Sequence, residues 1–201
     1  MKSKYLILGV GVALGIALLL VGWQYSLRPY TFRGSTIDPP VPAADFELMD
    51  QNGQNFRLSD QNGKIVLLFF GYTNCPDVCP LTLSDFKQVI AGLGDQADQV
   101  RFVFITVDPE RDTADVLRQY LPNFDPSIVG LTGTRQELEK VWGDYYVYQE
   151  KQDVGSSAGY VVDHTARTYL INQKGEWLLT YPFEMTKDDI LQDVRYLLSH
   201  G

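Results

Sequence analysis

Two cysteines, Cys75 and Cys79, lie four residues apart, and the chain contains no others. They follow a continuous apolar run, Ile65–Phe70, which predicts a buried strand, and they lead into a helical pattern, Leu81–Leu93. Two thiolates at positions i and i+4 near the start of a helix can hold one soft metal ion, such as Cu(I), or form one disulfide. A helix N-terminus also favours the thiolate, the form that binds metal and attacks disulfides. A purely structural disulfide is the weaker alternative, because so short a loop stabilises little.

The third residue of chemical interest is His164, one of two histidines in the sequence. A lone histidine is more often structural or exposed than a ligand, but two thiolates and one imidazole are a common donor set for soft metals. Asp163 or a backbone carbonyl would then fix the tautomer of the ring. Sequence spacing cannot bring His164 to the cysteines, so this hypothesis depends on the fold. The second histidine, His200, adjoins the C-terminus, where we expect an untethered tail.

Composition bounds the class of protein. The 201 residues, 45% hydrophobic and 21% charged, suit one globular domain with an appendage. The net charge is −8, and the only charged side chains before Asp38 are Lys2, Lys4, Arg28 and Arg33. Without these four, 13 basic residues face 25 acidic ones, a charge of −12. Such a body excludes nucleic acid as the expected partner. The negative charge is explained either by binding to a cationic ligand or a basic protein surface, or simply by an acidic surface that is solvated.

An uncharged apolar run, Tyr5–Trp23, is 19 residues long, enough to span a bilayer as a helix. A cleaved signal peptide is the alternative, but its apolar region is usually shorter and ends in small residues. We therefore expect residues 1–27 to form an uncleaved membrane anchor. The short N-terminal tail favours export of the larger C-terminal body, which places the soluble domain on the extracytoplasmic side, where a free dithiol tends to oxidise. Residues 28–44, rich in proline, are expected to be an extended linker.

The remaining residues, 45–201, predict one domain of alternating strands and helices. The expected elements are a hairpin about Asn52-Gly53, the strand Ile65–Phe70, the cysteine helix, a strand Val100–Val107, a helix from Asp112 or Thr113 to about Tyr120, a short strand Ile128–Leu131, a helix from Thr134 to about Trp142, a mobile loop Gln149–Gly159, a hairpin of Thr168–Ile171 with Trp177–Tyr181, and a helix Ile190–Leu198 capped by Thr186. This order predicts an α/β, thioredoxin-like fold: a mixed central sheet flanked by helices, with an extra N-terminal β-hairpin, preceded by one transmembrane helix.

Four patterns then occur in order along the chain: Gly71–Pro80, Val107–Thr113, Gly130–Gly133 and Asp163–Thr165. Together they resemble the SCO/SenC family, and the likeness extends from about Pro40 to the C-terminus. Members of that family are membrane-anchored, thioredoxin-like copper proteins associated with assembly of the CuA centre of cytochrome c oxidase.

The resemblance implies that Cys75, Cys79 and His164 bind one copper ion, Cu(I) or Cu(II). It also implies that the CuA-bearing subunit of the oxidase is the partner. The segment Asp108–Asp112 is a family signature near the site, and we assign it a role in shaping the loops around the ligands. Asn74 departs from the family, which often has histidine there, but this position is not one of the ligands.

Two functions remain open. The first is a copper metallochaperone, which is not a turnover enzyme. The second is a thiol–disulfide oxidoreductase, in which Cys75 and Cys79 form a redox-active dithiol that reduces the cysteines of the copper-site recipient, so that His164 is dispensable. Other copper chaperones or thiol reductants are further candidate partners. A peroxiredoxin-like peroxidase is disfavoured, because the residues before Cys75 lack the Pro-x-x-x-Thr-x-x-Cys pattern.

Overall fold

A computed structural model describes residues 15–20, 23, 29–153, 155 and 159–201. The chain divides into two compact units, Met1–Phe32 and Arg33–Gly201. Most of the expected membrane anchor, residues 1–27, lies outside the described residues. Within the described ranges, no helix combines the length and the apolar character needed to cross a membrane. The second unit contains both cysteines and both histidines.

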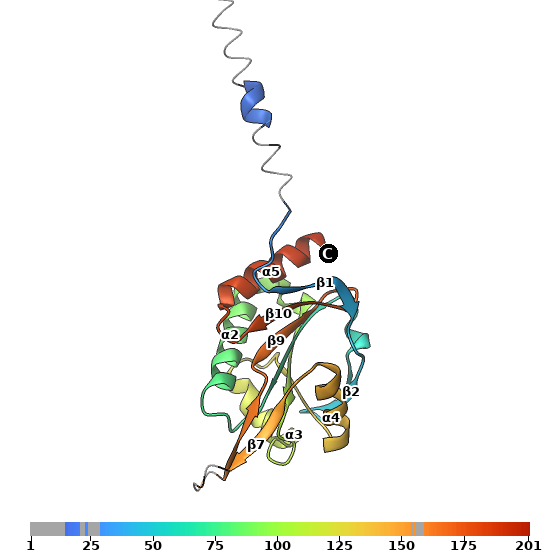
Figure 1. Ribbon diagram of the computed structural model, residues 1–201, viewed down its shortest axis with the longest axis vertical. Coiled ribbons are helices and arrows are strands. Elements are labelled where there is room, and N and C mark those ends of the chain that lie inside the picture. Colours follow the sequence, from blue (N-terminus) through green and yellow to red (C-terminus); the bar gives the residue numbers. More distant parts are fainter. Residues whose placement is uncertain (1–14, 21–22, 24–28, 154, 156–158) are drawn as a thin grey trace, which may run out of the picture. The chain divides into compact units, whose positions relative to one another are not determined.

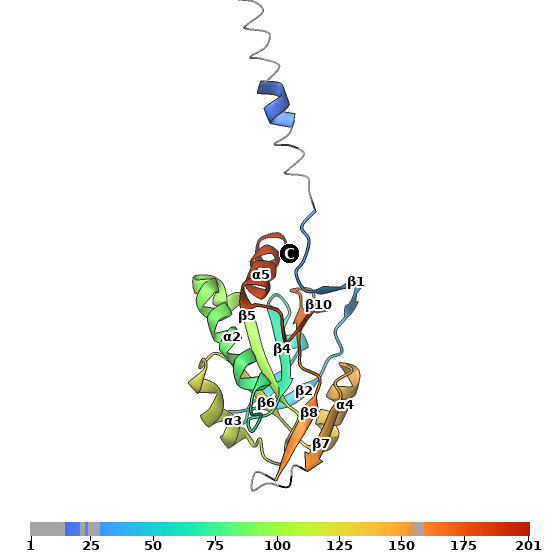
Figure 2. The same cartoon turned by 60° about the vertical axis from the view of Figure 1, so that its left-hand side comes forward.

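An eight-stranded mixed sheet forms the centre of this second unit (Figures 1 and 2). In spatial order its strands are β1 (Ser35–Pro42), β10 (Glu176–Pro182), β9 (Arg167–Ile171), β4 (Ile65–Gly71), β5 (Val100–Thr106), β6 (Val129–Thr132), β2 (Glu47–Asp50) and β3 (Asn55–Arg57). The central strands β4, β5 and β6 are parallel, and the strands on either side of them are antiparallel. All of β4 is buried, as expected for a strand with both faces covered. The chain leaves this strand directly into the cysteine loop.

Helices cover both faces of the sheet. They are α2 (Val78–Leu93), α3 (Ala114–Tyr120), α4 (Arg135–Asp144) and α5 (Lys187–His200), with short 3₁₀ turns η1 (Ser59–Gln61), η2 (Gly94–Gln99) and η3 (Leu121–Asn123). Successive residues of β4 point to opposite faces, so Phe69 contacts Phe86 of α2 while Phe70 contacts Tyr145 at the end of α4. Helices α2 and α5 pack against each other, and Figure 2 shows α3 on the same side of the sheet as α2. This arrangement confirms the expected α/β fold.

The local signals in the sequence are confirmed at most element ends. The hairpin of β2 and β3 turns at Gly53, whose φ of 76° lies in the left-handed region that glycine adopts without strain. Thr113, Thr134 and Thr186 cap α3, α4 and α5, and each side chain accepts a hydrogen bond from a backbone N–H of the first turn. These elements therefore follow from short-range chemistry.

The prediction of a mobile loop over Gln149–Gly159 is wrong for the first half of this segment. Gln149–Asp153 forms β7, which pairs with β8 (Tyr160–His164) in a two-stranded antiparallel ribbon outside the main sheet. The side chains of β7 are polar and none is buried, so the hydrophobic pattern gives no sign of a strand. Cross-strand pairing stabilises it instead. His164 is the last residue of β8, and the ribbon therefore positions it.

The folded domain also begins earlier than residue 45. Ser35–Pro42, inside the expected linker, is the edge strand β1, which pairs with β10. An edge strand tolerates proline, and the pairing shifts its register between Thr36 and Val41. Asp193 of α5 fixes the start of this strand, because its buried carboxylate accepts hydrogen bonds from the backbone N–H groups of Arg33 and Gly34.

Candidate metal centre

The three residues singled out in the sequence meet beside the carboxyl end of β4. Cys75 lies in the loop after this strand, Cys79 is the second residue of α2, and His164 ends β8. The two Sγ atoms and one ring nitrogen all lie within 4.8 Å of one another, and His164 Nε2 is 3.4 Å from Cys79 Sγ. Among the described residues, no other group of three histidine, cysteine or acidic side chains is placed to hold a metal ion. Three separate elements thus supply one donor set.

Room for the Cys79 sulfur comes from Gly71. Cys79 is fully buried, and a Cβ at position 71 would lie 2.9 Å from its Sγ and 2.9 Å from ring atoms of Phe69 and Phe104. Carbon and sulfur atoms do not approach so closely without displacement. The glycine at the end of β4 is therefore a packing requirement of the site.

Aromatic rings surround His164. The imidazole packs edge-to-face with Tyr72 and Phe69, at centroid distances of 5.7 and 6.4 Å. Its Nε2 faces the sulfurs, while its Nδ1 is buried and has no hydrogen-bond partner within the described part of the chain. The tautomer-fixing bond expected from Asp163 or a carbonyl is thus not found there. The half-buried imidazole is held mainly by packing against these rings, and its Nε2 is placed to act as a ligand beside the two sulfurs.

The two thiols differ in exposure and acidity. Cys79 is buried and Cys75 only half-buried. The pKa of Cys75 is lowered, chiefly by a hydrogen bond from the Cys79 thiol and also by His164 and nearby backbone N–H groups, against the opposing effect of burial. The pKa of Cys79 is raised, because it hydrogen-bonds to Cys75 and is buried. The pair therefore shares one proton, and Cys75 is the accessible thiolate.

Asp112 holds the loop that carries Cys75. Its fully buried carboxylate accepts hydrogen bonds from Thr73 N at 3.0 Å, Thr73 Oγ1 at 2.6 Å and Thr106 Oγ1 at 2.8 Å. Burial raises the pKa of this carboxyl, and the three donors partly offset that effect. The start of the cysteine loop is thereby fixed to the end of β5.

Asp108 and Arg111 hold the strand that carries His164. The Arg111 guanidinium pairs with the buried Asp108 carboxylate and donates to the Tyr160 carbonyl at 2.9 Å, and it lies 3.7 Å from the centre of the Tyr160 ring. The Tyr160 hydroxyl in turn donates to Asp108 at 2.8 Å. One short segment, Asp108–Asp112, thus positions both the cysteine loop and the histidine strand, which is the loop-shaping role expected from the sequence.

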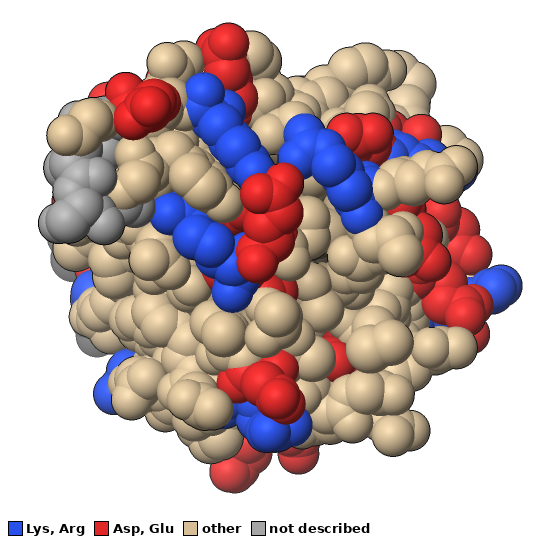
Figure 3. Space-filling view, turned by 90° about the horizontal axis from the view of Figure 1, so that it is seen from below, with Lys and Arg blue, Asp and Glu red and all other residues tan. Residues whose placement is uncertain are grey.

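An open groove of about 250 Å³ adjoins the donor set. Cys75 and His164 line it, together with the exposed carboxylates of Asp77 and Asp163. Figure 3 shows the face of the molecule that lies lowest in Figure 1. Acidic and basic side chains are interleaved on it, with uncharged areas between them. The net charge is therefore not gathered into one acidic patch on this face. The groove gives another molecule access to Cys75.

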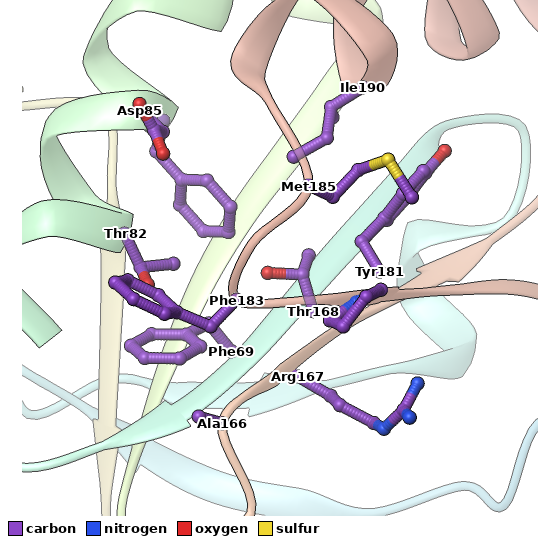
Figure 4. Close-up of a pocket in the computed structure, with 12 residues that line it drawn as sticks. Phe69, Thr82, Asp85, Ala166, Arg167, Thr168, Tyr181, Phe183, Met185 and Ile190 are labelled. Atoms are coloured by element: carbon purple, nitrogen blue, oxygen red, sulfur yellow. The ribbon is translucent and has the colours of Figure 1, made fainter. Parts of the chain in front are cut away.

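A second pocket, between α2 and the strands β9 and β10, is much smaller (Figure 4). Its volume of about 10 Å³ leaves room for about one water molecule. Phe69, Thr82 and Phe183 lie together on one side of it, and Met185 and Ile190 lie on the other. It is too small for a substrate, so its side chains act in packing α2 against the sheet.

Two residues of the site escaped sequence reasoning. Thr73 and Tyr72 belong to the cysteine motif, but nothing in the sequence indicates that Thr73 binds Asp112 or that the Tyr72 hydroxyl accepts a hydrogen bond from Val162 N. The partners are 39 and 90 residues away along the chain. Only the tertiary structure can bring them together.

Fold and site together define a thioredoxin-like protein with a two-cysteine, one-histidine donor set for a soft metal. The chain belongs to the SCO1/SenC family, whose model matches residues 35–199. A "SCO2-like protein" of Rickettsia felis is 31% identical over 189 residues, which cover 93% of this chain and 92% of the relative.

Solved structures of the family agree with this assignment. The Bradyrhizobium japonicum ScoI structure "with copper bound" is 38% identical, with a TM-score of 0.72, and covers 78% of this chain and 99% of that one. The solution structure of apo Sco1 from Thermus thermophilus is 36% identical, with a TM-score of 0.75, over 84% of this chain and 98% of that one. BsSco, described as having a disulfide switch and as a member of the Sco family of cytochrome c oxidase assembly proteins, is 26% identical, with a TM-score of 0.65, over 81% of this chain and 96% of that one.

Proposed function

We propose that this protein is a copper-binding metallochaperone that delivers copper for assembly of the CuA centre of cytochrome c oxidase. Cys75, Cys79 and His164 would hold one copper ion per chain. The observation that carries the proposal is the approach of two thiols and one imidazole to within 4.8 Å of one another. This set suits Cu(I), and one added ligand would accommodate Cu(II). The copper-bound ScoI structure supports the choice of metal.

The unequal exposure of the ligands suits delivery. Cys79 is buried and fixed in α2, whereas Cys75 borders the open groove. A cysteine of the recipient can enter the groove and replace the sulfur of Cys75 as a ligand, after which Cys79 and His164 release the ion. Oxidation of Cys75 and Cys79 to a disulfide gives up two electrons to an oxidant, releases the one proton that the pair shares, and leaves no thiolate, so the redox state of the pair would control loading.

The proposed partner is the CuA-bearing subunit of the oxidase, and other copper chaperones or thiol reductants would act before it. We further propose that residues 1–27 anchor the chain in a membrane, with the soluble domain on the extracytoplasmic side. The uncharged run Tyr5–Trp23 supports this placement. An alkaline-phosphatase fusion placed after the run should be active, and an inactive fusion would contradict the exported topology.

Copper stoichiometry tests the binding site. The reduced full chain should bind about one equivalent of copper, and His164→Ala and the double variant Cys75→Ser, Cys79→Ser should lose tight binding. His200→Ala is the matched control, because this exposed histidine stacks on Tyr196 at the end of α5, and it should bind like the wild type. Absence of tight copper in the reduced wild type would overturn the proposal.

Delivery needs a second experiment, in which the loaded chain is mixed with the reduced, copper-free CuA domain. Failure of copper to move to that domain would contradict the chaperone role but not copper binding.

A thiol–disulfide oxidoreductase is the second candidate function. The asymmetry of the pair favours it: a half-exposed thiol of lowered pKa attacks, and a buried thiol next to it resolves the mixed disulfide. The BsSco disulfide switch gives it further support. Copper-free His164→Ala should then still reduce an oxidised CuA domain, while Cys75→Ser should not. Equal inactivity of the reduced wild type and Cys75→Ser would exclude this function.

A further inference from the structure

Tyr72 joins the two halves of the site. It is the first residue after β4, it is buried, and its carbonyl oxygen accepts a hydrogen bond from Cys75 N at 3.3 Å. Its side chain extends in the other direction, where the hydroxyl oxygen accepts a buried hydrogen bond from Val162 N at 3.2 Å. Val162 lies two positions before His164 on β8. One residue therefore contacts the cysteine loop through its backbone and the histidine strand through its phenol.

The hydrogen bond from Val162 N lies on the edge of β8 that faces away from β7, where no strand among the described residues pairs with β8. Thr165 N bonds to Tyr148 O on the β7 side, and alternation along an antiparallel strand then directs the backbone groups of Val162 away from β7. Arg111 bonds to the Tyr160 carbonyl on this same outer side. The Tyr72 hydroxyl is thus a lateral support for β8 close to His164, whose ring it also packs against at a nearly perpendicular angle of 89°.

The hydroxyl still has its own proton to place. A phenol can accept one hydrogen bond and donate another. Tyr72 lines the same groove as Cys75 and His164, so the Cys75 sulfur is an acceptor on the same wall of the site. The nearby Cys75 side chain is also one of the smaller causes that raise the pKa of Tyr72, after its burial. The Cys75 thiolate is a charged acceptor in this groove, and hydrogen bonds to charged groups are stronger than those between neutral groups.

We propose that the Tyr72 hydroxyl is a positioning group that links the Val162 N–H of the histidine strand to the sulfur of Cys75. It holds His164 at its distance from the thiols, and it withdraws electron density from one of the two sulfur ligands. Groups that hydrogen-bond to metal ligands orient them and tune the metal, and hydrogen bonding at a cysteine sulfur shifts the potential of copper sites. This inference rests on the proposed function only in so far as the site binds copper.

Tyr72→Phe is the test, because it removes one oxygen and keeps the ring packing. Each of the two bonds has its own readout. In the copper-free full chain, hydrogen exchange of the Val162 amide should become roughly 10-fold faster, because its acceptor is gone. In the Cu(II)-loaded chain, the sulfur-to-copper charge-transfer band should move to longer wavelength, and Cu(II) affinity should gain relative to Cu(I), because the Cys75 sulfur becomes the better donor.

Tyr148→Phe is the matched control. Its exposed hydroxyl bonds to Glu150 on β7 and does not line the groove, so both readouts should stay at wild-type values. Wild-type exchange at Val162 in Tyr72→Phe would overturn the link, and an unmoved band would overturn the effect on the sulfur. Failure of the wild type to bind copper would contradict the proposed function instead, and the exchange measurement, made without metal, would still decide the link.

Discussion

Asp112 offers the sharpest test of how the site is held, because its three hydrogen bonds can be removed or kept by choice of substitution. Asp112→Ala leaves the Thr73 N–H and the Thr106 hydroxyl without their acceptor. Each buried donor left unpaired costs roughly 1–3 kcal/mol, so we expect a loss of about 3 kcal/mol in the free energy of unfolding. In urea this corresponds to a transition midpoint lower by about 1–2 M. Copper affinity should fall too, because the cysteine loop loses its attachment to β5.

Asp112→Asn should be far milder. An amide oxygen in the place of Oδ2 still accepts from Thr73 N and Thr106 Oγ1, and the amide NH₂ in the place of Oδ1 can donate to Thr73 Oγ1. The negative charge itself contributes little, since burial raises the pKa of this carboxyl. We therefore expect a change within about 1 kcal/mol at neutral pH, which is near the net value of a single hydrogen bond.

The contribution of Asp112 to the free energy of unfolding depends on pH, and the direction of this dependence follows from its pKa. The folded state raises the pKa of Asp112 above its ordinary value of 3.8, so it binds the proton more tightly than the unfolded state does. Between 3.8 and the raised pKa, the contribution of this carboxyl to stability therefore grows as the pH falls. Asp112→Asn should lack that contribution. The comparison is between urea transitions of wild type and variant across the acidic range.

The control is Asp125→Ala, which removes a surface aspartate whose carboxylate accepts hydrogen bonds from nearby Ser127. It should shift the urea midpoint far less than Asp112→Ala. An asparagine variant as unstable as the alanine variant would refute the reasoning, because it would show that charge and not the number of acceptors holds the loop. A midpoint for Asp112→Ala equal to that of the control would refute it as well.

Two further predictions concern the cysteines. Gly71→Ala should destabilise the protein by about 1–3 kcal/mol and weaken copper binding, because the added methyl group overpacks against the Cys79 sulfur. The control is Gly143→Ala in α4, where the space around the glycine is open, and it should stabilise the protein by roughly 0.5–1 kcal/mol in the same thermal melts. Equal shifts in melting temperature for the two variants would contradict the packing argument. Iodoacetamide should modify Cys75 and spare Cys79 in the reduced, metal-free chain, and the Cys75 rate should persist well below the ordinary thiol pKa of about 8.5 before it falls at lower pH. Peptide mass spectrometry follows both sites, and a rate that already falls tenfold per pH unit at neutral pH would contradict the lowered pKa.

The sequence determined those features that short-range chemistry controls. The apolar run from Ile65 predicted the buried strand β4, and threonine caps and the Asn52-Gly53 turn placed element ends to within a few residues. The pairing of Cys75 with Cys79 was fixed by their spacing at the start of a helix. In each case the interacting atoms are neighbours along the chain, so residue order alone specifies the geometry.

Strands without a hydrophobic pattern were beyond such reasoning. The residues of β7 are polar because, in the described part of the chain, the strand pairs only with β8 and its side chains are not buried. β1 can contain prolines because it lies at the edge of the sheet. Pairing partners decide both strands, and these partners come from later in the chain. The position of β8, and with it the setting of His164, therefore could not be predicted locally.

Only the tertiary structure decided that His164 reaches the cysteines, that Asp112 binds Thr73, and that the Tyr72 hydroxyl meets Val162. These contacts join residues 39 to 90 positions apart. The contacts of His164 and Val162 depend on how the ribbon of β7 and β8 packs beside the carboxyl end of β4. Hydrogen bonds and metal ligation are sensitive to tenths of an ångström, and no pattern of residue types along the chain carries that information. The residue types made the chemistry available, and the packing of three separate elements made it one site.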